Sequence, residues 1–151
     1  MDPVTFCIHT GLSHFTMLHT VTGVEKDTVF GTCVFDKTPG FLAMEACAQL
    51  GALHVRWIRH FTCHAFLLKV NHFEMPVSDP FDGKYTLFGK LTGKSRMAFS
   101  HTIKMTGENG QETKGQFLFA VTPYDDHFDK KILQPHYKKV FSCLENAFVN
   151  D

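Results

Sequence analysis

A single carboxylate in the middle of an apolar stretch is the feature of this sequence that most constrains how it can fold. From residue 38 to residue 55, Glu45 is the only residue of the Asp, Glu, Lys and Arg types. A stretch this apolar belongs in the interior of a domain. An unpaired carboxylate there is costly to bury. We therefore expect the chain to keep Glu45 because its function uses it.

The same stretch has the pattern of a central helix. Thr38 offers a hydroxyl for the N-cap and Pro39 suits the first helical position, so a helix is predicted over 41–61. Its small residues would let other elements approach closely; they are Ala43, Ala46, Ala48, Gly51 and Ala52. A helix that is apolar over most of its circumference is predicted to lie inside the domain rather than on its surface.

Strand patterns lie on both sides of this helix. β-branched and aromatic residues, alternation and turn signals predict strands over 15–21, 28–35, 65–73, 84–91, 97–105 and 116–121. Asn109-Gly110 is a strong hairpin signal between the last two. One buried helix followed by antiparallel strands predicts an α+β fold of the hotdog type, in which an antiparallel sheet wraps around a long central helix.

The end of the chain predicts a second, amphipathic helix. After Pro135, apolar residues recur at a spacing of three or four: Tyr137, Val140, Phe141, Leu144 and Phe148. We expect this helix to cover an exposed edge of the sheet or of a pocket, rather than to bind a partner. A single hotdog domain over 1–151 is predicted, with a core at about 12–122 and a helical extension at about 128–149.

Composition excludes several classes of function. The formal net charge is zero and no long run of like charge occurs, so neither nucleic acid nor a membrane is an expected partner. The five scattered cysteines and ten histidines show no CxxC or HExxH spacing. We therefore predict no metal site, no cofactor and no disulfide framework. The start of the chain does not have the pattern of a signal peptide, and a cytoplasmic location is expected.

Two motifs carry a resemblance to a known family. Residues 39–49 resemble the P-G-x-L-x-x-E-A-x-A-Q signature of FabZ-type 3-hydroxyacyl-(acyl carrier protein) dehydratases. Residues 69–82 resemble the N-x-x-F-x-x-P-V-x-x-G-D segment of the same family, and residues 15–21 resemble its entering strand less closely. Together these matches cover roughly residues 14–121.

The resemblance implies roles for particular residues. Glu45 would take the catalytic carboxylate role, and the backbone amide at Gly40 would face the thioester oxygen. Gln49, one turn after Glu45, would orient it. The acyl chain would enter an apolar tunnel with four lining residues: Phe41, Met44, Phe66 and Phe73.

The resemblance also implies partners. The substrate would be an acyl thioester on acyl carrier protein or coenzyme A. Hotdog subunits usually pair with their sheets continuous and their central helices side by side, so a homodimer, or a larger oligomer, is expected. The strand at 69–73 would then lie near the interface.

One departure from the family pattern changes the expected chemistry. The family's catalytic histidine lies in a loop before the helix, and Gly31 stands at that position here, in a segment predicted as strand. A replacement would have to come from elsewhere, and the candidates are His9, His14, His19 and His72. The motif histidine is therefore missing from its place.

Three functions remain open from the sequence. The first is a dehydratase-like enzyme of fatty-acid or polyketide-type metabolism, with Glu45 as acid and base. The second is a hotdog thioesterase, with Glu45 as the base for water or as a nucleophile. The third is a non-catalytic acyl-binding or structural subunit, in which backbone amides or Gln49 satisfy the Glu45 carboxylate.

Overall fold

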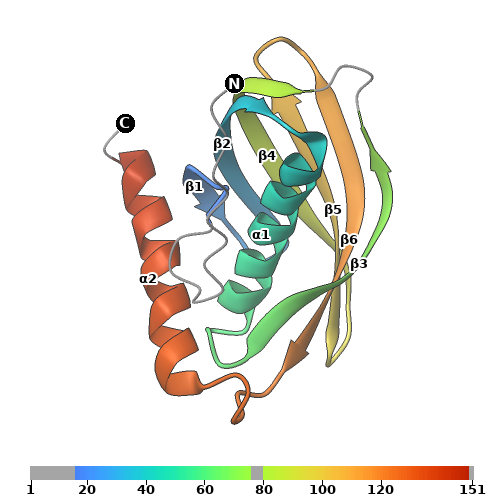
Figure 1. The fold of residues 1–151 in the computed structure, drawn as a ribbon. Helices are drawn as coiled ribbons and strands as arrows, with labels where there is room; N and C mark the ends of the chain where they lie inside the picture. The colour runs from blue at the N-terminus through green and yellow to red at the C-terminus, as the bar shows by residue number, and fades with distance from the viewer. Residues whose placement is uncertain (1–15, 76–79, 150–151) are drawn as a thin grey trace.

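A sheet that curves around one helix forms the body of the protein (Figure 1). The computed structural model describes residues 16–75 and 80–149. The elements are β1 (Thr20–Val24), β2 (Thr28–Thr38), α1 (Gly40–Ile58), β3 (His64–Glu74), β4 (Phe81–Lys94), β5 (Ala98–Gly107), β6 (Glu112–Thr122) and α2 (Lys130–Val149). The strands of the described residues form one antiparallel sheet in the order β1-β2-β4-β5-β6-β3. The predicted α+β hotdog arrangement is confirmed.

The inner face of the sheet and α1 form the core. Along β5 and β6, buried and partly exposed residues alternate, as a half-buried antiparallel strand requires. The inward-facing side chains include Ile103, Met105 and Phe119, and Leu50 of α1 is fully buried against this face. Packing of one sheet face against α1 therefore fixes the position of this helix. It also fixes the position of Glu45, which the helix carries.

Small residues allow α1 to lie close to the sheet, as the sequence predicted. A Cβ atom added at Gly51 would lie 2.4 Å from ring atoms of Phe119, so only glycine fits at this contact. Cys47 of α1 is fully buried near Cys33 of β2, and burial raises the pKa of the Cys33 thiol to about 12. Both cysteines act as small apolar core residues.

The predicted boundaries of the first strand and of α1 need correction. β1 starts at Thr20. Before it, the His19 amide donates to the Thr32 carbonyl of β2, whereas the Met17 amide donates to the Gln49 side chain. Thr38 ends β2, and its hydroxyl donates to the Asp36 carbonyl instead of capping α1. The N-cap is Pro39, and no side chain caps the helix. The helix ends at Ile58 rather than at residue 61.

The second helix lies within the predicted extension at about 128–149 and begins before Pro135, after which its apolar spacing was recognised. It starts at Lys130 rather than at Pro135, because the Asp129 carboxylate accepts a hydrogen bond from the Lys131 amide and caps the first turn. Phe141 and Leu144 are buried, and the helix packs along β1 (Figure 1). It thus covers one edge of the sheet, as expected; the Phe148 side chain lies outside the described part. Within the described residues, neither helix combines the length and the apolar character needed to cross a membrane.

Candidate functional site

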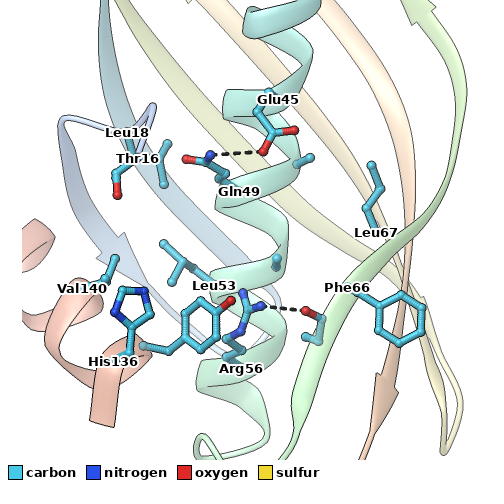
Figure 2. A pocket seen from close by; sticks show the side chains of 14 residues that line it. Thr16, Leu18, Glu45, Gln49, Leu53, Arg56, Phe66, Leu67, His136 and Val140 are labelled. Carbon is cyan, nitrogen blue, oxygen red and sulfur yellow. Dashed lines mark hydrogen bonds between the residues drawn. The ribbon is translucent and has the colours of Figure 1, made fainter. Parts of the chain in front are cut away.

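A pocket opens along α1, between β3 on one side and α2 on the other (Figure 2). Its volume is about 330 Å³. The walls come from α1, from β3, from α2 and from the segment that precedes β1, and most of the lining side chains are apolar. Among its polar side chains, Glu45 lies toward one end and Arg56 toward the other (Figure 2).

A chain of hydrogen bonds fixes the carboxylate end. Gln49 Nε2 donates to Glu45 Oε1 over 3.1 Å, and Gln49 Oε1 accepts from the Met17 amide over 2.8 Å. Because Met17 holds the oxygen of the Gln49 amide, the amide nitrogen must face Glu45. Glu45 is half-buried, and no cationic side chain of the described residues lies within ion-pair distance of it. A carboxylate held in this way can accept a proton from water or from a substrate carbon.

The structure brings some of the predicted site residues together and leaves others apart. Glu45, Gln49 and Phe66 line the same pocket. Phe41 does not line it and is 62% exposed, and Met44 packs partly buried against the core. These two residues do not form the wall of the described pocket.

Phe73 also lies away from the pocket. The β3–β6 register shifts between Asn71 and Glu74, where His72 adopts a φ of 51°. This irregularity accompanies a T-shaped contact of the Phe73 ring with the Phe117 ring, 6.0 Å between centroids. Phe73 is therefore a core contact here rather than a lining residue of the pocket.

Gly40 lies at the uncapped start of α1. It is buried, and a Cβ atom added to it would lie 1.8 Å from the terminal methyl of Met75, so this side chain covers the first turn. The helix dipole makes this end electropositive. Gly40 is not among the residues that line the Glu45 pocket, and its role as an oxyanion donor stays a prediction.

Of the four histidines suggested as replacements, the two that the structure describes do not line the pocket of Glu45. His9 and His14 lie outside the described residues, while His19 and His72 are exposed and do not line the pocket. Gly31 lies in β2, so the family's histidine position is a strand residue, as the sequence indicated. In the described part of the pocket the one histidine is His136 of α2, which lies toward Arg56 and away from Glu45 (Figure 2).

The residues at this second end of the pocket were not predicted as site residues from the sequence. Arg56 is 6% exposed, and burial lowers the pKa of its guanidinium. Its Nη2 donates to the Ala65 carbonyl over 2.6 Å, and its guanidinium carbon lies 3.6 Å from the centroid of the Tyr137 ring. The helical period held a usable signal, because Arg56 follows Glu45 by about three turns and therefore shares its face.

A second polar cluster lies in the core and not in the pocket. His54 Nε2 is 2.8 Å from the Glu25 carbonyl, which can only accept, so Nε2 carries a proton. His54 Nδ1 then accepts from His101 Nε2 over 2.9 Å, which leaves the buried Nδ1 of His101 without a proton or a partner. Burial lowers the pKa of His101 to about 3, and both rings are neutral at pH 7.

The described residues hold no group of three or more His, Cys, Asp or Glu side chains arranged to bind a metal. No family model matches the chain, and no curated protein matches it.

Several solved structures are similar to this one. A thioesterase of Pseudomonas aeruginosa aligns with a TM-score of 0.58 at 14% identity, over 68% of this chain and 80% of that chain. A dehydratase heterocomplex of Xenorhabdus doucetiae aligns with a TM-score of 0.63 at 14% identity, over 79% and 88%. The chain has the hotdog fold. A Streptococcus mutans protein bound to acetyl-CoA shares this hotdog fold, with a TM-score of 0.61 at 19% identity over 73% and 92%.

Proposed function

We propose that the protein hydrolyses acyl thioesters, with Glu45 as the base that activates water. The observation that carries this proposal is the open pocket in which Glu45 is oriented by Gln49, without a histidine at that end among the described residues. Hydrolysis needs one base and a bound water, whereas dehydration needs a base for the carbon proton and an acid for the leaving hydroxyl.

The proposed reaction has two steps. In the first, the Glu45 carboxylate takes a proton from water, the water oxygen bonds to the thioester carbon, and the carbonyl oxygen becomes an oxyanion. In the second, the oxyanion collapses, the carbon–sulfur bond breaks and the thiolate leaves with the proton from Glu45. Amides near Gly40 are the proposed donors to the oxyanion, since a helix start favours developing negative charge.

A dehydratase is the second candidate. It is supported by the two sequence motifs, and one structural neighbour is a dehydratase heterocomplex. This reaction would require a second acid–base group close to Glu45, for example from a partner subunit. The thioester carrier in either case is proposed to be coenzyme A or acyl carrier protein, and the setting to be lipid metabolism in the cytoplasm.

A substrate panel distinguishes these reactions. The purified chain is offered saturated, 3-hydroxyacyl and 2-enoyl thioesters, each on coenzyme A and on acyl carrier protein, while free thiol and the enoyl chromophore are followed together. We expect thiol release from the saturated thioester. Interconversion of the 3-hydroxyacyl and 2-enoyl forms without thiol release would favour the dehydratase instead. No turnover of any member would leave only the non-catalytic acyl-binding role.

We also propose that the protein is a homodimer joined along β3. This strand forms one edge of the sheet, while α2 packs along β1 at the other edge. β3 exposes three consecutive apolar side chains, Phe66, Leu67 and Leu68. An exposed apolar edge strand is a template for pairing with a second chain. Because Phe66 and Leu67 also line the pocket, the partner would lie beside the site.

The mass of the protein in solution tests the dimer. Light scattering after size exclusion is expected to give twice the chain mass for the wild type, and a larger monomer fraction for Leu68→Lys, because a charge on the edge opposes strand pairing. Val34→Lys on β2 is the matched control, since Val34 is also an exposed apolar residue but lies on a strand that pairs with β1 and β4 and not with β3. A monomeric wild type, or equal dissociation by both substitutions, would contradict the β3 interface.

A further inference from the structure

Arg56 is a buried cation that has no anionic partner among the residues that the structure describes. It lines the pocket at the end opposite Glu45 and is 6% exposed (Figure 2). No carboxylate of the described residues lies within ion-pair distance of its guanidinium. Its Nε is buried and has no hydrogen-bond partner among these residues. A donor and a positive charge are thus left unsatisfied at the end of an apolar pocket.

The contacts that Arg56 does make hold it in place without neutralising it. Nη2 donates to the backbone carbonyl of Ala65 on β3, and the guanidinium stacks on the Tyr137 ring of α2. One contact comes from β3 and the other from α2, on opposite sides of the pocket. The two elements together fix the orientation of the guanidinium group. Neither a carbonyl nor an aromatic ring supplies a negative charge.

A purely structural role does not explain a residue of this kind. Burial of an ionised group is costly unless it is paired, and an apolar side chain of similar volume would fill the same space at lower cost. The planar guanidinium, by contrast, is suited to bidentate recognition of a carboxylate. An anion that binds to Arg56 would offset the cost of keeping it charged in the interior.

The lining of the pocket between Glu45 and Arg56 indicates what kind of molecule would carry an anion to Arg56. Arg56 follows Glu45 by three turns of α1, which corresponds to about 16 Å along the helix axis. Leu18, Leu53 and Val140 line the pocket with Ala48 and Ala52. An alkyl chain fits this lining, whereas a coenzyme phosphate would have to cross it. An anion bound at Arg56 would therefore lie at the far end of an apolar chain.

We propose that Arg56 binds a carboxylate at the far end of the acyl chain, so that the substrate class is a long-chain thioester with a terminal carboxylate. This inference rests on the proposed function, because it places the thioester at Glu45. The acyl chain then spans the pocket with the thioester at one polar end and the carboxylate at the other. Tyr137 is a positioning residue that holds the guanidinium toward the ligand.

A pair of thioesters of equal length tests the proposal. Affinity and thiol release are measured with a saturated acyl-CoA that ends in a methyl group and with its analogue that ends in a carboxylate. We expect the wild type to bind the carboxylate form at least tenfold more tightly. The preference should disappear in Arg56→Gln and be partly retained in Arg56→Lys, which keeps the charge but not the fork.

Matched controls separate the subsite from the fold. Arg59→Gln removes a nearby arginine that does not line the pocket and should keep the preference. Tyr137→Leu should reduce the preference while the charge remains, and unfolding curves for every variant show whether it is folded. Arg56→Gln is expected to be at least as stable as the wild type, because it removes an unpaired buried charge.

The outcomes distinguish this inference from the proposed function. Equal affinity of the wild type for the two thioesters, with both hydrolysed, would overturn the carboxylate subsite and leave the hydrolase intact. An Arg56-dependent preference in binding without any hydrolysis would support the subsite and contradict the hydrolase. Arg56-dependent binding of adenosine 3′,5′-bisphosphate would assign Arg56 to the coenzyme and overturn the inference. The inference would also be overturned if Arg56→Gln dissociated a dimer while the preference for the carboxylate thioester stayed unchanged. Arg56 would then pair with the second copy of the chain.

Discussion

Glu45→Gln is expected to lower kcat for thioester hydrolysis by about 10²–10⁴-fold, the range typical for loss of a positioned general base. Glutamine has nearly the shape of glutamate, and its side-chain oxygen can still accept from Gln49 Nε2. The pocket and the fold should therefore be preserved, and KM should change little. The measurement is steady-state thiol release, with Tm recorded for the same samples.

Glu145→Gln is the matched control for this substitution. Glu145 is an exposed carboxylate on α2 that does not line the pocket, so its loss should leave kcat unchanged. If Glu45→Gln retains the wild-type kcat, Glu45 is not the base. If its Tm falls steeply with kcat, the carboxylate serves the fold and the loss of activity is indirect.

The second large effect is a loss of stability in acid. Burial lowers the pKa of His101 to about 3, and it lowers the pKa of its partner His54 as well. In the unfolded chain a histidine has a pKa of about 6.5. Between these pH values the unfolded state binds protons that the folded state does not, so the free energy of unfolding falls as the pH drops below about 6.5. The expected loss by about pH 4 is on the order of a few kcal/mol.

Urea unfolding at pH 7.5 and at pH 4.5, at one protein concentration, measures this effect. His101→Gln keeps a donor toward His54 Nδ1 but does not titrate, so it should flatten part of the pH dependence. The rest belongs to His54 and to His64, whose pKa burial lowers to about 4. His127→Gln, at an exposed position, should behave as the wild type. A pH dependence that is the same in His101→Gln and the wild type would contradict this account of the buried pair.

The fold was predictable because its signals are local. The apolar stretch around Glu45 has the length and period of a helix, and the alternation along 97–105 marks one buried sheet face; both became elements of the structure. The boundaries were less predictable because hydrogen bonds decided them. Asp129 caps α2 before Pro135, and the sequence alone could not show that this carboxylate meets the Lys131 amide.

The candidate site was predictable at one end only. Glu45 and Gln49 are one turn apart on one helix, so their contact follows from the helical period. In the sequence, Arg56 looked like the charged end of the apolar stretch. Its burial was not predictable, because it depends on Tyr137, which lies far along the chain on α2. The environment of Arg56 thus arises from the tertiary packing of a helix that is distant in sequence. The contact of Phe73 with Phe117 was not predictable for a similar reason, since it accompanies an irregularity in β3.

A single-turnover reaction in isotopically labelled water shows directly whether the protein hydrolyses an acyl thioester. The purified protein, in molar excess, is mixed with a saturated long-chain acyl-CoA in water enriched in a heavy oxygen isotope. The masses of the products are then measured by mass spectrometry. We expect free coenzyme A and carboxylic acid in equal amounts, with one heavy oxygen atom in the acid. Recovery of the unchanged acyl-CoA would contradict this expectation.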